Sequence, residues 1–197
     1  YAIEDAKAVN MAKDTIEKAI KKASGEGNDG VTYEEVRYEG YGPAGVAIIV
    51  DVLTDNVNRT APEMRKLFEK GNGNLAKPGA VAFGFTSSGV ILIESENATE
   101  DDLMEVALEA GANDITSSEG GFEVTCEPTD FLTVKQAIES AGIAMVSSEV
   151  TMVPSTTVDC DVDTGEKVLK LLEALEDHDD VQKVYSNADI PEEAMEA

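Results

Sequence analysis

The chain has 197 residues, 42% of them hydrophobic, and a formal net charge of −25 at pH 7. A surface this acidic repels nucleic acid and anionic membranes on average, so contact with either requires one locally basic patch. No run approaches the roughly 18 apolar residues of a membrane span, and no signal peptide opens the chain. We therefore expect a cytoplasmic protein with no membrane partner.

The first half of the chain predicts a helix, a linker and then strands around a second helix. Tyr1 already stands within the first helical pattern, so we expect further residues upstream. A nearly continuous β-branched run at 46–53 is typical of a central strand. Thr60 and Glu63 form a capping-box pattern, and Gly71 is placed to end that helix. In order, the expected elements are helix 2–23, linker 24–30, strand 34–39, strand 46–53, helix 60–70 and strand 80–85.

From Val90 onward the pattern restarts in the order β-α-β-β-α-β, which is the ferredoxin-like arrangement. Thr99 and Asp102 predict a capped helix start, and Glu119-Gly120 predicts a hairpin turn. The expected elements are strand 90–94, helix 99–110, strands 114–118 and 121–126, helix 131–141 and strand 145–153. A strand at 156–162, a helix capped by Thr164 and a strand at 181–185 complete the chain.

Two stretches that are separated in the sequence together make up one further domain. Residues 46–86 give β-α-β, and residues 156–185 give β-α-β, so together they form a second β-α-β-β-α-β unit interrupted by the first. We therefore predict an α+β protein with two ferredoxin-like βαββαβ domains, one inserted in the other, plus the remnant of an N-terminal helical domain. The predicted boundaries are 1–27 for the helical remnant, 28–86 with 151–197 for the central discontinuous domain, and 87–150 for the inserted domain.

Several patterns that resemble active sites have simpler structural explanations. The run from Gly40 to Gly45 matches G-x-G-x-x-G, but a strand and not a helix follows it, so we interpret it as a turn. His178 is the only histidine and has neither metal-ligand spacing nor a triad signature. Cys126 and Cys160 fit buried free thiols better than a disulfide or a metal site. We expect no enzyme activity, no catalytic residue, no metal, no other cofactor and no small-molecule substrate.

One stretch departs from the acidic composition. Residues 57–78 contain five basic residues against two glutamates, and Lys66 and Lys70 share a helix face at i, i+4. The loop at 72–74 could hydrogen-bond a phosphate or a base edge. A solvated face that balances nearby acid explains the same residues equally well. The candidate nucleic-acid contacts are Arg59, Arg65, Lys66, Lys70, Asn72, Asn74 and Lys77, with a smaller cluster at Lys18, Lys21 and Lys22.

Seven runs dispersed over essentially the whole chain carry a resemblance to a known family. They lie at 10–22, 33–46, 53–60, 73–75, 149–157, 167–177 and 184–187. Together they resemble the YebC/PmpR family, whose mitochondrial relatives activate translation. The family's opening basic segment is absent here, Ala12 stands where the family has Pro, and Ser87-Ser88 stands where paired lysines are common.

The resemblance implies a basic N-terminal helical domain, a central α/β domain and an inserted α/β domain. It also implies a non-enzymatic regulator of gene expression, classed as a DNA-binding transcriptional regulator. The alternative is a ribosome-associated translation factor that contacts ribosomal RNA, and a pure protein-interaction scaffold is the third hypothesis. We expect a monomer whose partner is nucleic acid (DNA or rRNA) or the ribosome. The sequence does not separate the first two hypotheses.

Overall fold

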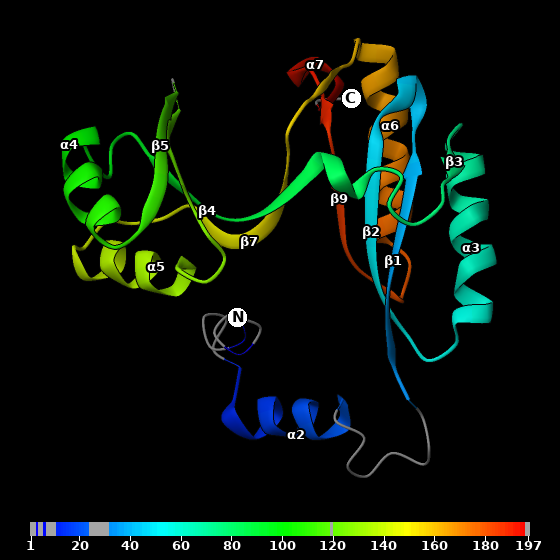
Figure 1. The fold of residues 1–197 in the computed structure, drawn as a ribbon, viewed down its shortest axis with the longest axis horizontal. Helices are drawn as coiled ribbons and strands as arrows, with labels where there is room; N and C mark the ends of the chain where they lie inside the picture. The colour runs from blue at the N-terminus through cyan, green and yellow to red at the C-terminus, as the bar shows by residue number, and fades with distance from the viewer. Residues whose placement is uncertain (1–2, 4–5, 7–10, 24–31, 119, 196–197) are drawn as a thin grey trace. The chain divides into compact units, whose positions relative to one another are not determined.

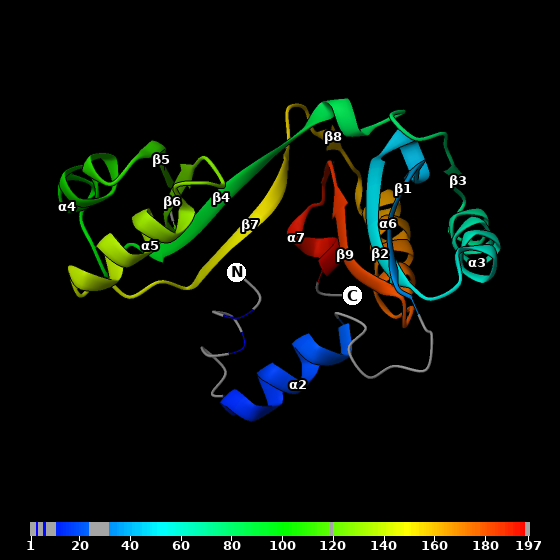
Figure 2. The same cartoon turned by 60° about the horizontal axis from the view of Figure 1, so that its bottom comes forward.

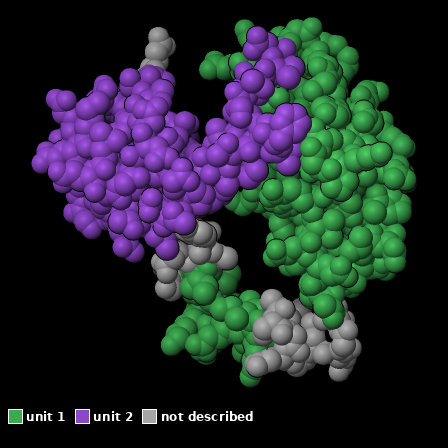
Figure 3. Space-filling model, in the orientation of Figure 1, with its two compact units in different colours: residues 1–80, 160–197 green, residues 81–159 purple. Residues whose placement is uncertain are grey.

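The computed structural model describes residues 3, 6, 11–23, 32–118 and 120–195 (Figure 1). The chain forms two compact units, which Figure 3 distinguishes by colour. We call Val81–Asp159 the inserted unit, and Tyr1–Ala80 with Cys160–Ala197 the central unit. The predicted inserted domain, 87–150, lies within the inserted unit, and the exact domain boundaries stay a prediction. No helix in the described ranges has the length and apolar composition needed to cross a membrane.

The central unit is built on a four-stranded antiparallel sheet. Its strands are β1 (Glu34–Tyr41), β2 (Ala47–Thr54), β3 (Asn74–Leu75) and β9 (Val181–Ser186), in the spatial order β3-β1-β2-β9. Its main helices are α3 (Val57–Lys70) and α6 (Val162–Glu176), and it also holds α2 (Lys13–Ala23), β10 (Ala188–Asp189) and α7 (Glu192–Met195). The α+β class is therefore confirmed.

The core of the central unit lies between this sheet and its two long helices (Figure 2). Ile48 and Val50 of β2 are fully buried, as are Phe68 of α3 and Leu175 of α6. Gly40 in β1 lies directly against the Phe68 ring, so a side chain there would collide with it. The run from Gly40 to Gly45 forms the end of β1 and a tight turn, Pro43–Gly45, which leads into β2. The predicted turn is confirmed.

The inserted unit has the predicted ferredoxin-like topology. Its elements are β4 (Phe85–Glu94), α4 (Glu100–Leu103) with a π-helical turn (Met104–Leu108), β5 (Ala112–Ser118), β6 (Gly121–Cys126), α5 (Phe131–Ser140), β7 (Ser147–Pro154) and β8 (Val158–Asp159). The sheet is antiparallel with the order β5-β6-β4-β7. Ile91 and Val124 of the sheet pack with Leu103, Val134 and Ile138 of the helices in one core.

The central sheet has four antiparallel strands, as predicted, but two of them come from other parts of the chain than the prediction placed them. The predicted strand at 80–85 is wrong, because residues 82–84 form a short 3-10 turn and only Phe85 is extended, as the first residue of β4. Pro78 has no N–H to donate to a sheet, and Gly79 adopts a left-handed φ of 83°. The predicted strand at 156–162 shrinks to β8. In the central sheet, β3 stands where the strand at 80–85 was expected, and β1 stands where the strand at 156–162 was expected.

Two predicted helix starts are also wrong. The Asn56 side chain caps α3 by accepting from the Arg59 N–H at 3.2 Å, so the helix begins at Val57 and not at Thr60. Likewise, Asp161 caps α6 by accepting from the Thr164 N–H at 2.8 Å. In contrast, the capping box predicted at Thr99 is confirmed. Neither cysteine forms a disulfide, as predicted, although only Cys126 is buried, whereas Cys160 is partly exposed.

Candidate nucleic-acid interface

Helix α3 carries most of the predicted nucleic-acid contacts, and its sequence makes it amphipathic. Thr60, Met64 and Phe68 recur at i, i+4 and i+8 and are all fully buried against the sheet. The predicted cations occupy the remaining positions of the helix, so they project away from the core. The structure divides these cations into two groups, one at each end of the helix.

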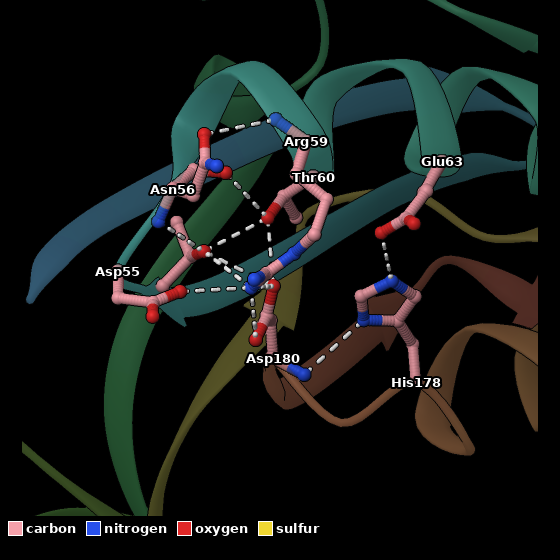
Figure 4. A network of polar contacts seen from close by, with 8 residues as sticks. Asp55, Asn56, Arg59, Thr60, Glu63, His178 and Asp180 are labelled. Atoms are coloured by element: carbon pink, nitrogen blue, oxygen red, sulfur yellow. Dashed lines mark hydrogen bonds and ion pairs between the residues drawn. The ribbon is translucent and has the colours of Figure 1, made fainter.

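At the start of α3, Arg59 belongs to an internal polar network (Figure 4). Its Nη2 donates to the Asp55 carboxylate at 2.9 Å and to the Asp180 carboxylate at 2.9 Å. Hydrogen bonding to Asp180 raises the pKa of Arg59, and the bond to Asp55 adds to this effect. Because two carboxylates already balance its charge, Arg59 adds little positive charge that a nucleic acid could use.

Asp180 is the centre of this network. Its Oδ2 also accepts from the hydroxyls of Thr60 at 2.7 Å and Thr54 at 3.0 Å. Both threonines are fully buried, and the Asp180 side chain is only 16% exposed. Burial alone would raise the pKa of Asp180, but the bonds from Thr60, Arg59 and Thr54 outweigh it and hold the pKa below its usual value. The network joins the first turn of α3 to the segment between α6 and β9.

His178 extends the network and has a structural role there. Its Nδ1 accepts from the Asp180 N–H at 3.1 Å, and its Nε2 lies 3.0 Å from the Glu63 carboxylate. An accepting Nδ1 places the ring proton on Nε2, which donates to Glu63. The expectation of a solvated loop is therefore only partly correct, because the His178 side chain is just 17% exposed. Among the described residues, no group of His, Cys, Asp and Glu side chains is arranged to hold a metal ion.

The second half of α3 presents the other cations to solvent. Arg65, Lys66 and Lys70 are exposed, and the described part of the chain offers none of them an ion-pair partner. Lys66 and Lys70 are four residues apart and share one helix face, whereas Arg65 lies on the adjoining flank. We call Arg65, Lys66 and Lys70 the α3 cation cluster.

The loop after α3 has a structural reason for its sequence. Asn72 adopts a left-handed φ of 58°, its N–H donates to the Glu69 carbonyl at 3.2 Å, and the Gly73 N–H donates to the Phe68 carbonyl at 2.8 Å. This pair of bonds is the Schellman motif that ends many helices. Asn72 is therefore explained by helix capping, although its side chain is exposed and free to bind a ligand as well.

The remaining predicted contacts lie on other elements. Asn74 opens β3 and pairs with Tyr41 of β1, and Asn74 and Lys77 are both exposed. Lys18 and Lys21 are exposed on α2, while the side chain of Lys22 lies outside the described residues. The structure thus brings one set of predicted contacts together on α3 and its following loop, and the lysines of α2 belong to a separate helix.

The polar network is the feature that the sequence did not predict. Asp180 lies more than 100 residues from its partners, Thr54 and Thr60. No local pattern joins such distant positions, since Asp180 stands in an acidic run that resembles any solvated loop. The only signal was indirect: Thr60, placed as a helix cap, is one of the residues that the network buries.

The fold and this surface define a class of protein: a ferredoxin-like unit inserted in a second antiparallel α+β unit that carries a cationic helix face. A family model described as "TACO1/YebC second and third domain" matches residues 33–188. The chain therefore belongs to the TACO1/YebC family, and the predicted resemblance is confirmed.

Individual relatives agree with this assignment. A protein of Fusobacterium nucleatum, named "Probable transcriptional regulatory protein", is 53% identical over 196 residues, which cover 99% of this chain and 78% of the relative. A protein of Hahella chejuensis with the same description is also 53% identical, with the same coverage. The crystal structure of a conserved hypothetical protein from Aquifex aeolicus matches with a TM-score of 0.80 and 43% identity, covering 96% of this chain and 78% of that one.

Proposed function

We propose that this protein is a non-enzymatic regulator of gene expression that binds the sugar–phosphate backbone of nucleic acid through the α3 cation cluster. The observation that carries the proposal is the pair Lys66 and Lys70, which is exposed on one helix face without a carboxylate partner among the described residues. In a chain with a net charge of −25, unpaired cations at one place are unusual. Each can neutralise a phosphate and release its counterions, which drives binding.

DNA is the first candidate target. The names of the Fusobacterium and Hahella relatives support a role in transcription. Lysine contacts with phosphates position a protein on DNA without reading its sequence. Under this hypothesis, the exposed amides of Asn72 and Asn74 after α3 are the candidates for contact with a base edge, because amide side chains pair well with adenine.

Ribosomal RNA is the second candidate, and the start of α3 favours it. The N-terminal turn of a recognition helix reads bases in helix-turn-helix proteins, but here Asn56, Arg59 and Thr60 are hydrogen-bonded within the protein. Cations that contact only the backbone suit a folded RNA, which is recognised largely by shape and phosphate position. A ribosome-associated translation factor would need no base-reading element.

The test replaces Lys66 and Lys70 together by glutamine in the full chain and measures affinity for duplex DNA and for ribosomal subunits over a range of salt concentrations. We expect weaker binding and a log–log salt slope reduced by about two, because each lysine–phosphate contact contributes about 0.9 to the slope. The matched control is Lys167→Gln with Lys170→Gln on α6, where both lysines are paired with helix neighbours. The control makes the same change in charge and should leave the slope unaltered.

The two targets give different results in the same assay. A preference for promoter DNA over random DNA at physiological salt supports transcription, whereas co-sedimentation with ribosomes that depends on Lys66 and Lys70 supports translation. If both double variants bind both targets as the unaltered chain does, the α3 cation cluster is not the contact surface and the proposal is wrong.

A further inference from the structure

The sheet of the inserted unit has one face in the core and one face open to solvent. Ile91 and Ile93 of β4 point into the core. Because successive side chains of a strand point to opposite faces, Leu92 and Glu94 point to the other face. Register extends this face across the sheet, because residues directly opposite each other share a face. One row is Ser147–Leu92–Glu123–Thr116, and the next is Glu94–Gly121–Ser118.

An apolar patch with an acidic border lies on this open face. Leu92 is 38% exposed and Val146 is 60% exposed, and the Val146 N–H donates to the Leu92 carbonyl at 2.8 Å, which fixes the two residues side by side. Leu92 and Val146 line a shallow groove whose other walls include Glu94, Glu123 and Thr116. We call this groove the β4–β6 groove.

The charge of the inserted unit defines the kind of ligand that fits the β4–β6 groove. Residues 81–159 contain fifteen acidic residues and a single basic residue, Lys135. Glu94 and Glu123 are exposed, and neither has a cationic partner in the ranges that the structure describes. A polyanion would be repelled here. A ligand with a cationic side chain beside an apolar one could pair with the glutamates and cover the apolar side chains at the same time.

We propose that the β4–β6 groove is a second interaction surface, which binds a lysine- or arginine-rich segment of another protein. Apolar side chains of that segment cover Leu92 and Val146, and its cations pair with Glu94 and Glu123. Charge complementarity selects this occupant over nucleic acid and over another copy of this acidic chain. The inference does not depend on the α3 cation cluster, because all of these residues lie in the inserted unit.

The test titrates the isotope-labelled full chain with a synthetic peptide of alternating lysine and valine, and with a matched peptide in which glutamate replaces lysine. We expect the lysine peptide alone to shift the backbone NMR signals of Leu92, Glu123 and Val146. Glu94→Gln with Glu123→Gln should weaken the affinity at least tenfold. Leu92→Gln with Val146→Gln should do the same without changing the charge, and circular dichroism should show that both variants stay folded.

The matched control is Glu105→Gln with Glu109→Gln, which removes two exposed charges from the helical side of the same unit. Affinity within twofold of the unaltered chain supports a localised site. If the control weakens binding as much as the groove variants do, the peptide responds only to the overall charge of the unit, and the proposal is overturned. It is also overturned if the peptide does not bind, if an RNA oligonucleotide shifts the same signals instead, or if the groove proves to be covered by a second copy in sedimentation experiments.

Discussion

Among the described residues, two that are not glycine adopt left-handed backbone conformations, and they do so for different reasons. Asn72 has a φ of 58° and Ala44 has a φ of 55°. Asparagine tolerates this region well, and Asn72 is the residue that closes α3. Alanine does not tolerate it, so the turn between β1 and β2 holds Ala44 against a cost of about 1–2 kcal/mol.

We predict that Asn72→Gly leaves stability nearly unchanged, whereas Asn72→Ala lowers the free energy of unfolding by about 1 kcal/mol, because alanine pays the left-handed penalty. Urea unfolding measures both changes. Nucleic-acid affinity of Asn72→Gly is the second measurement: a loss of affinity at unchanged stability assigns the amide a binding role, and unchanged affinity restricts Asn72 to capping.

Ala44→Gly should stabilise the protein. The substitution removes about 1–2 kcal/mol of left-handed strain, whereas the greater freedom of glycine in the unfolded chain costs about 0.5–1 kcal/mol. We therefore expect the free energy of unfolding to rise by about 0.5–1 kcal/mol. Thermal unfolding of the full chain would detect it as a higher Tm. A lower Tm would mean that the side chain of Ala44 makes contacts worth more than the strain.

At the scale of elements, the Asp180 network anchors the start of α3 to the segment between α6 and β9. Asp180→Asn removes the negative charge to which Arg59, Thr54 and Thr60 donate. We expect the free energy of unfolding at neutral pH to fall by about 2 kcal/mol, which is typical of losing a hydrogen bond to a charged group. Asp179→Asn in the same segment is the matched control, since Asp179 is exposed, and it should change stability little.

The same network gives the stability a definite pH dependence. Although burial opposes it, the pKa of Asp180 is lowered in the folded protein by its bonds to Thr60, Arg59 and Thr54. A lowered carboxyl pKa contributes stability that is complete above the unfolded value, about pH 4, and is lost as the pH falls through the folded value. The difference between the unaltered chain and Asp180→Asn should therefore shrink below about pH 4 in chemical unfolding experiments. A constant difference would contradict the network.

The sequence predicted elements whose signals are local and missed features that arise from distant contacts. The order of elements in the inserted unit and the cap at Thr99 follow from periodicity and short-range hydrogen bonds. Thr60 was misplaced as a cap because its hydroxyl bonds Asp180 across the fold. For the same reason, the sequence did not show that Arg59 is paired with Asp180. Arg65, Lys66 and Lys70 are exposed without such a partner among the described residues.

At the scale of the whole molecule, charge repulsion opposes folding. With 40 acidic and 15 basic residues, the compact chain brings like charges together. Added salt screens this repulsion over about 10 Å at 0.1 M, and it also weakens exposed pairs such as Arg37–Asp51. Repulsion involves many more groups, so we expect Tm to rise by about 3 °C, or about 1 kcal/mol, between low and moderate sodium chloride. Calorimetry measures this directly, and a falling Tm would show that the ion pairs dominate.

The two ends of the inserted unit lie next to each other, since Phe85 pairs with Pro154 and the Ser155 N–H donates to the Gly84 carbonyl at 2.8 Å. Chain segments that enter and leave at neighbouring points leave almost no gap behind when everything between them is removed. We therefore expect that replacing the residues between these two points by a tight turn leaves the central unit able to fold.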